Sequence, residues 1–300
     1  MLLDRRRLLL MGGTAAVALL TGCGMTNQQP SADRREGDRG TRRVPDEGGE
    51  WWVPSTTRPA PTVVLVHGGY WQPGFDRHLE DDLAADLCSR GYLVWNIDYQ
   101  PATAGWPAPL VSAASAYDHL AVGRFEHLVD PTRLAVVGHS AGGQLALWLA
   151  SRDRLPAGAA GVPVQPWLRP ALAVGQAPVA ALIPAADEDL GGGAAVELCG
   201  GTPRTVPDRY AIADPSELVP ATCPVVLIHG RNDDVVPLSQ SRRYEAAAYA
   251  ARADVQLFVV PGGHFEHLEP RSTACQRLRS VLHHTIGTAM PAAQVAAARN

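Results

Sequence analysis

The sequence predicts an α/β domain with a mostly parallel central sheet, helices on both faces and a small irregular lid. Short apolar runs, which are typical of buried strands, alternate along the chain with segments whose apolar residues recur at helical spacing. The chain has 300 residues, of which 46% are hydrophobic, and this is enough to bury the core of one such domain. The Gly- and Pro-rich stretches 156–170 and 184–220 predict a modest lid over a fairly open site.

The predicted elements alternate between strands and helices. Continuous apolar runs are typical of parallel strands that are buried on both faces. Strands are predicted at 62–66, 92–99, 133–137, 224–230 and 255–260. Helices are predicted at 76–90, 110–125 and 144–150.

The segment Gly138-His139-Ser140-Ala141-Gly142 joins a predicted strand to a predicted helix. Small residues on both sides of Ser140 allow a sharp turn, which places the serine oxygen at the carboxyl edge of the sheet and beside a helix N-terminus. In this context the Gly-x-Ser-x-Gly sequence predicts a nucleophile rather than an ordinary glycine turn. A serine hydroxyl is a weak nucleophile near neutral pH, so Ser140 needs a histidine base and an acid that orients the base.

The base is expected in a loop that follows a late strand. His264 ends the sequence Pro261-Gly262-Gly263-His264, which comes directly after the predicted strand 255–260. The glycines free the backbone to bring the imidazole over the serine. The sequence therefore predicts His264 as the general base.

The acid is expected between the nucleophile and the base. Asp233 and Asp234 both follow the predicted strand 224–230. The run from His229 to Pro237 resembles the hydrolase pattern His-Gly-x-x-Asp-x-x-Val-Pro, and this resemblance implies that Asp233 is the acid. Asp234 is then a solvated turn residue or a helix cap; the opposite assignment of the two aspartates is the alternative.

A glycine loop for the oxyanion follows the predicted strand 62–66. The loop sequence His67-Gly68-Gly69-Tyr70-Trp71 resembles the His-Gly-Gly oxyanion loop of esterases. The resemblance implies that the backbone N–H groups of Gly69 and Tyr70 hold the oxyanion together with that of Ala141. Tyr70, Trp71 and His139 are the candidates for substrate contact, and His67 is expected to bond within the loop.

With these motifs in this order, the chain resembles the α/β-hydrolase superfamily from about residue 51 to residue 286. Within it, the glycine loop and the nucleophile segment are most similar to the carboxylesterase and arylformamidase branch, which includes feruloyl-esterase-like hydrolases. Tyr70 and Trp71 stand where hormone-sensitive-lipase-type esterases have a third glycine, which argues against a lipase-like assignment. The resemblance implies a Ser140-His264-Asp233 triad that needs no cofactor.

The N-terminal segment predicts export and a lipid anchor. Residues 1–22 have a basic start and an apolar stretch too short to span a membrane, as in signal peptides. The following Cys23 resembles the lipidated cysteine of a bacterial lipobox, and the consecutive arginines also resemble a twin-arginine signal. Residues 23–50 predict a disordered tether, 51–290 the catalytic domain and 291–300 a tail. The expected location is the outer face of a bacterial cytoplasmic membrane.

Composition argues against several other classes of protein. The net charge is −4, and no basic patch is interleaved with aromatic residues, which argues against nucleic-acid binding. The chain contains no lysine, so Schiff-base chemistry is excluded. The histidine spacing matches no zinc motif, so no metal is predicted. The remaining cysteines are Cys88, Cys199, Cys223 and Cys275, and Cys199 with Cys223 is the first pair to consider for a disulfide.

The sequence thus predicts a membrane-anchored, exported serine hydrolase. Its expected substrates are small or medium carboxylic esters, cleaved through an acyl-enzyme on Ser140. An arylformamidase-like amide hydrolase is the near alternative. A surface lipoprotein that keeps the fold only as a binding scaffold is the alternative from another class.

Overall fold

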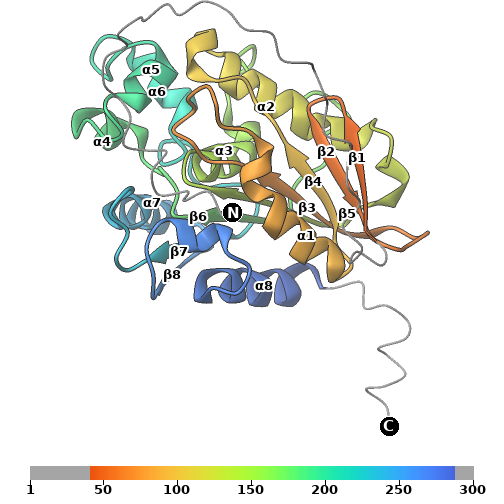
Figure 1. Cartoon of the computed structure of the whole chain (residues 1–300). Coiled ribbons are helices and arrows are strands. Elements are labelled where there is room, and N and C mark those ends of the chain that lie inside the picture. The colour runs from red at the N-terminus through yellow and green to blue at the C-terminus, as the bar shows by residue number, and fades with distance from the viewer. Residues whose placement is uncertain (1–40, 288–300) are drawn as a thin grey trace, which may run out of the picture. The chain divides into compact units, whose positions relative to one another are not determined.

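An eight-stranded sheet runs through residues 41–287, the part of the chain that the computed structural model describes (Figure 1). The strand order is β1-β2-β4-β3-β5-β6-β7-β8. Neighbours from β4 to β8 pair in parallel, whereas β2 pairs antiparallel with both β1 and β4. The strands are β1 Arg42–Asp46, β2 Gly49–Val53, β3 Ala60–Val66, β4 Leu93–Ile97, β5 Val129–His139, β6 Leu172–Gln176, β7 Val225–Gly230 and β8 Val255–Val260. The predicted α/β class with a mostly parallel sheet is confirmed.

Helices cover both faces of this sheet (Figure 1). Leu87 of α1 and Leu282 of α8 share one buried cluster with Val63 and Val137, which point to the same face of neighbouring strands. Helix α3 packs against β3, β5 and β6 and also contacts α2. The helices are α1 Asp81–Ser89, α2 Ala108–Asp118, α3 Ala141–Leu149, α4 Leu182–Asp187, α5 Ala194–Cys199, α6 Pro207–Ala213, α7 Ser239–Ala250 and α8 Thr273–Ile286. Within residues 41–287 no helix combines the length and the apolar character needed to cross a bilayer.

The predicted start of the catalytic domain at residue 51 is wrong. Strands β1 and β2 form an antiparallel hairpin that belongs to the main sheet and includes residues 42–50. β1 is an edge strand with mostly exposed, charged side chains, so its composition resembles that of a linker. The hairpin is held by Trp51, whose ring stacks on Trp95 with 4.6 Å between the ring centroids. The predicted signal segment, Cys23, the tether up to residue 40 and the tail 291–300 lie outside the described residues.

The segment between β6 and β7 is also more regular than predicted. The sequence predicts an irregular lid at 184–220, whereas the structure forms the short helices α4, α5 and α6 there. Each helix has only six or seven residues, and glycines and prolines separate them, so no long apolar periodicity is visible in the sequence. Strand β6 was not predicted either, because its apolar run is short and includes Gly175.

Candidate active site

Ser140 lies on a sharp turn between β5 and α3, at the carboxyl edge of the sheet. Its φ and ψ are 58° and −120°, a conformation that non-glycine residues adopt only where the surroundings hold them in it. The Ser140 N–H donates to the carbonyl of Gln176 at 2.9 Å, and the Ser140 carbonyl accepts from Val179 at 3.2 Å. The loop after β6 therefore fixes the backbone of the candidate nucleophile.

The glycines around Ser140 are required by close backbone packing. A Cβ atom on Gly138 would lie 2.0 Å from the carbonyl oxygen of Gly142. One on Gly142 would lie 2.1 Å from the carbonyl oxygen of Val66 and 2.3 Å from that of His67. Only glycine fits at these two positions, and the fit brings the start of α3 directly against the loop that follows β3.

His264 and Asp233 come together from the loops after β8 and β7. His264 Nδ1 lies 2.8 Å from Asp233 Oδ2, and both side chains are buried. The other carboxylate oxygen of Asp233 accepts hydrogen bonds from the backbone N–H groups of Val235 and Val236. Because an ionised carboxylate can only accept, Nδ1 of His264 carries the hydrogen and Nε2 is left as a proton acceptor.

Asp233 rather than Asp234 contacts the imidazole. Burial alone raises the pKa of Asp233, but hydrogen bonds from His229 and His264 outweigh it and hold that pKa well below its usual range. Asp234 is exposed. His229 is a neighbour of the acid to which the sequence analysis gave no role: its Nε2 lies 3.4 Å from Asp233 Oδ2 and 2.9 Å from the carbonyl oxygen of Val236. It is the first residue of the pattern that located Asp233.

The loop after β3 carries three consecutive residues with positive φ. The values are 114° for Gly69, 51° for Tyr70 and 56° for Trp71. Among the backbone hydrogen bonds of the described loops, none is donated by the N–H of Gly69 or Tyr70. Ala141 is the first residue of α3, where N–H groups have no partner within the helix. The N–H groups of the three predicted oxyanion donors thus have no hydrogen-bond partner among the described loops.

All three residues predicted to contact substrate are buried, and each uses a polar side-chain atom in a hydrogen bond within the protein. Trp71 is 1% exposed and its indole N–H donates to Gln144 Oε1. His139 is 3% exposed and its Nε2 lies 3.0 Å from the carbonyl oxygen of His264. Tyr70 is 9% exposed, and its hydroxyl donates to the carbonyl of Val235 at 2.9 Å. The sequence showed aromatic residues in a loop but could not show that their polar atoms are used to fasten that loop.

A group of buried imidazoles lies behind His264. The ring of His139 is centred 4.6 Å from that of His264 and 5.7 Å from that of His267. Burial and the neighbouring imidazoles lower the pKa of His139 well below its usual value, and they lower that of His267 to about 3. His139 and His267 are therefore neutral at physiological pH. His67 is also buried, and its ring stacks on Tyr99 with 4.2 Å between the centroids.

The cysteines and the metal motifs can be described for residues 41–287. Cys88, Cys199, Cys223 and Cys275 are free thiols in this part of the chain, so the considered Cys199–Cys223 disulfide is not formed. Burial raises the pKa of Cys199 and of Cys223 to about 12. In the same residues no group of His, Cys, Asp or Glu side chains is arranged to hold a metal ion.

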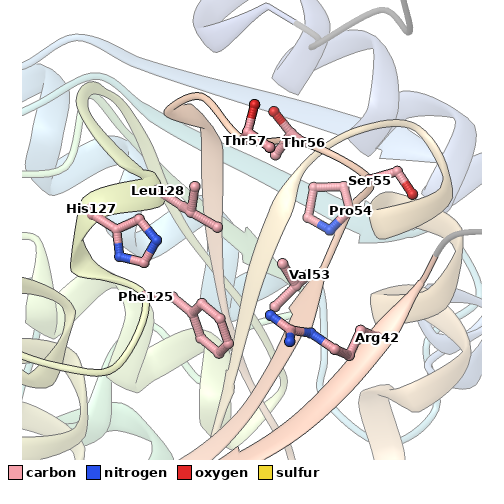
Figure 2. Close-up of a pocket in the computed structure, with 9 residues that line it drawn as sticks. All are labelled: Arg42, Val53, Pro54, Ser55, Thr56, Thr57, Phe125, His127 and Leu128. Carbon is pink, nitrogen blue, oxygen red and sulfur yellow. The ribbon is translucent and has the colours of Figure 1, made fainter.

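Two hollows lie away from these residues. One, of about 640 Å³, is lined by the segment between β2 and β3 and by residues that precede β5 (Figure 2). This places it at the amino ends of β3 and β5, the edge of the sheet opposite Ser140. The other, of about 1250 Å³, follows α2 and the loop at 161–166. Ser140, Asp233 and His264 line neither hollow.

Comparisons with known proteins place the chain in a family. The BD-FAE family model matches residues 51–247, which include Ser140 and Asp233, whereas His264 lies beyond the match. Kynurenine formamidases from Salmo salar and Drosophila melanogaster are 31% identical over 103 and 102 residues, so the matched part of this chain spans about a third of the length of these curated relatives.

Solved structures share the fold at low sequence identity. An acetyl ester-xyloside bifunctional hydrolase from Caldicellulosiruptor lactoaceticus is 23% identical with a TM-score of 0.65, and the match covers 80% of this chain and 88% of that one. Esterase B from Lactobacillus rhamnosis is 23% identical with a TM-score of 0.66, and the match covers 79% of each chain. The chain has the α/β-hydrolase fold and belongs to the BD-FAE family.

Proposed function

We propose that this protein is a serine hydrolase that cleaves carboxylic esters of small or medium acyl groups. The observation that carries the proposal is the buried hydrogen bond between His264 Nδ1 and Asp233 Oδ2, which leaves Nε2 as a base. His264 is fastened to the nucleophile turn, because its carbonyl is bonded to His139, the residue before Ser140. The other two parts of the proposed site are the nucleophile, Ser140 on its strained turn, and the oxyanion donors, the unpartnered N–H groups of the glycine loop.

In the proposed first half-reaction, the Ser140 oxygen attacks the ester carbonyl carbon. His264 Nε2 takes the hydroxyl proton, and the carbonyl electron pair moves onto its oxygen. The N–H groups of Gly69, Tyr70 and Ala141 donate to this oxyanion, and losing one donor of this kind typically slows a reaction about 10²- to 10³-fold. The carbon–oxygen bond to the alcohol then breaks, and the alcohol leaves with the proton from His264.

In the second half-reaction, water attacks the acyl-enzyme. His264 takes a proton from the water, and the same N–H groups stabilise the second oxyanion. The bond to Ser140 breaks, and the serine oxygen recovers its proton from the imidazolium. The ionised Asp233 stabilises the positive imidazolium in both halves without itself taking the proton.

Hydrolysis of an aryl formamide is the second candidate. It is favoured by the alignment with the two kynurenine formamidases. The same groups serve, but the bond that breaks is carbon–nitrogen and the leaving amine needs the proton from His264 more than an alcohol does. Comparing kcat/KM for N-formyl-kynurenine with that for short-chain nitrophenyl esters chooses between the two reactions.

A fluorophosphonate probe tests the nucleophile. We expect the full-length protein to be labelled and to hydrolyse nitrophenyl acetate, and we expect Ser140→Ala to lose both properties. Ser151→Ala is the matched control, because Ser151 is also a buried serine, at the other end of α3, and its hydroxyl only donates to the carbonyl of Leu147. Folded wild-type protein that takes no label and cleaves neither substrate class would favour the binding-scaffold alternative.

We also propose that Cys23 carries a lipid anchor that holds the exported enzyme on the outer face of the bacterial cytoplasmic membrane. The support is the sequence of the N-terminal segment alone. Cys23→Ser is expected to move the protein from the membrane fraction to a soluble or unprocessed form. Unchanged partitioning of this variant would contradict lipidation.

A further inference from the structure

Gln144 is a polar side chain in the core, one helical turn after Ser140. It lies on α3, it is fully buried, and its backbone N–H donates to the carbonyl of Ser140 at 3.2 Å. A buried amide is unfavourable unless its oxygen and its NH₂ group are both bonded. The partners that Gln144 uses therefore show what this residue does in the fold.

Both ends of the Gln144 amide are bonded to segments that are far away in the sequence. The carbonyl oxygen accepts from the indole N–H of Trp71 at 3.1 Å. The NH₂ group donates to the carbonyl oxygen of Ala213, the last residue of α6, at 2.9 Å. One side chain thus joins the glycine loop after β3, the helix that begins beside the nucleophile, and the helical segment between β6 and β7.

The contact with Trp71 is made at the strained end of the glycine loop. Trp71 is the last of the three positive-φ residues, and a β-carbon-bearing residue keeps such a φ only when other contacts hold it. Its carbonyl oxygen accepts from the N–H of Ala102, and its side chain has Gln144 as its hydrogen-bond partner. The directions of the Gly69 and Tyr70 N–H groups depend on the conformation of Trp71, because the three residues belong to the same turn.

We propose that Gln144 is a positioning residue for the oxyanion hole, and this inference rests on the proposed function. Gln144 holds the Trp71 indole, Trp71 holds the glycine loop in its positive-φ conformation, and that conformation directs the N–H groups of Gly69 and Tyr70 at the oxyanion. Leucine or methionine at 144 would fill the space but would leave the indole N–H and the Ala213 carbonyl unpaired.

Gln144→Met and Trp71→Phe test the contact from its two sides. We expect each variant to lower kcat for a nitrophenyl ester about 10- to 100-fold with KM changed less than about 3-fold, since mispositioned donors weaken binding of the transition state more than that of the substrate. If the two residues act through one contact, the double variant is at most about 3-fold slower than the slower single variant. Trp71→Phe leaves α3 unchanged, so it tests the contact even if Gln144→Met does not fold.

Gln240→Met is the matched control. Gln240 is another fully buried helical glutamine, on α7, and its side-chain oxygen accepts from the N–H of Ala181, which lies outside the glycine loop. We expect it to lose stability in urea but to keep kcat within about 3-fold of wild type. An equal loss of kcat in Gln240→Met and Gln144→Met would overturn the positioning role, because it would reduce both residues to general core contacts.

Hydrogen exchange of the Trp71 indole gives a readout that does not depend on activity. By NMR we expect the indole N–H to exchange slowly in wild type and at least 10-fold faster in Gln144→Met. An active wild type with unchanged kcat in Gln144→Met and Trp71→Phe would overturn the positioning role alone. A wild type that neither hydrolyses esters or formamides nor takes the fluorophosphonate would overturn the proposed function itself.

Discussion

The two edges of the sheet differ in where the backbone is strained. In the described part of the chain, six residues other than glycine have positive φ. Four of them lie in loops that follow strands at the carboxyl edge: Tyr70, Trp71, Ser140 and Ala177. At the opposite edge, Arg252 before β8 is the one such residue in the described chain. The segments 54–59 and 124–128 contain none, although a hollow of about 640 Å³ lies between them (Figure 2). Strain thus marks the candidate site more sharply than hollowness does, because strained backbone persists only where the surrounding structure fixes it.

Buried polar atoms show the same difference. Four side-chain atoms without a hydrogen-bond partner lie at the carboxyl ends of β3, β5 and β6 and in the loop after β8. They are His67 Nε2, His139 Nδ1, Gln176 Oε1 and His267 Nε2. In the hollow at the other edge, Ser55, Thr57 and His127 are exposed to solvent, which can satisfy them. The carboxyl edge therefore gives up stability at these four groups, and the hollow does not. The difference is from the hollow and not from the whole amino edge, because the buried Tyr92 hydroxyl at the start of β4 also has no partner.

The largest expected effect is on turnover at the carboxyl edge. Asp233→Asn is expected to lower kcat for a nitrophenyl ester by about 10³- to 10⁴-fold, because an amide at this position favours the wrong tautomer of His264. Asp234→Asn is the matched control and is expected to stay within about 3-fold, because its side chain is exposed. Steady-state kinetics of the two variants shows which aspartate is the acid. A large loss of kcat in Asp234→Asn with little change in Asp233→Asn would make Asp234 the acid.

The next effect is on the fold at the same edge. Gly142→Ala places a Cβ atom 2.1 Å from the carbonyl oxygen of Val66, and we expect the free energy of unfolding to fall by about 3 kcal/mol or more. Gly158→Ala is the control, because Gly158 has a positive φ of 81° but open space around it. That variant is expected to lose only about 1 kcal/mol. Similar urea midpoints for the two variants would show that the turn at Ser140 can relax.

Features of the fold and site that are set by neighbouring residues could be predicted from the sequence, whereas features that depend on contacts between distant segments could not. The strand-turn-helix context located Ser140. Short local patterns located His264 and Asp233, which contact each other in the structure. β1 and α4 to α6 were missed, because an edge strand of charged residues and helices of six or seven residues carry little periodicity. The burial of Trp71 and His139 was missed for another reason: their partners, Gln144 and His264, come from other segments, and local sequence does not specify such contacts.

A smaller difference between the two edges is expected in how far the free energy of unfolding falls at acidic pH. His267 has a pKa lowered to about 3 by burial and by His264 and His229, so the unfolded chain binds a proton at this residue between about pH 6.5 and 3 and the folded chain does not. The stability that the neutral ring preserves is fully present above pH 6.5 and is lost as the pH falls. Between pH 6.5 and 5 we expect a loss of about 2 kcal/mol from this residue.

Urea unfolding at the two pH values measures this loss. His267→Gln is expected to flatten the pH dependence by about the same amount. His127→Gln, at the opposite edge, is the control, because His127 is exposed. A pH dependence equally steep in His267→Gln and wild type would show that the buried ring is protonated without cost.

The smallest effect is expected from the hollow at the amino edge. Arg42 lines it, and its guanidinium lies over the ring of Phe125 at 5.1 Å from the centroid. Arg42→Ala should cost about 0.5–1 kcal/mol of stability through this contact. It should leave kcat and KM within about 2-fold of wild type, because the hollow lies at the opposite edge of the sheet from the strained loops. A large change in KM for either substrate class would mean that this edge takes part in binding, and hollowness would then count as a marker of function beside strain.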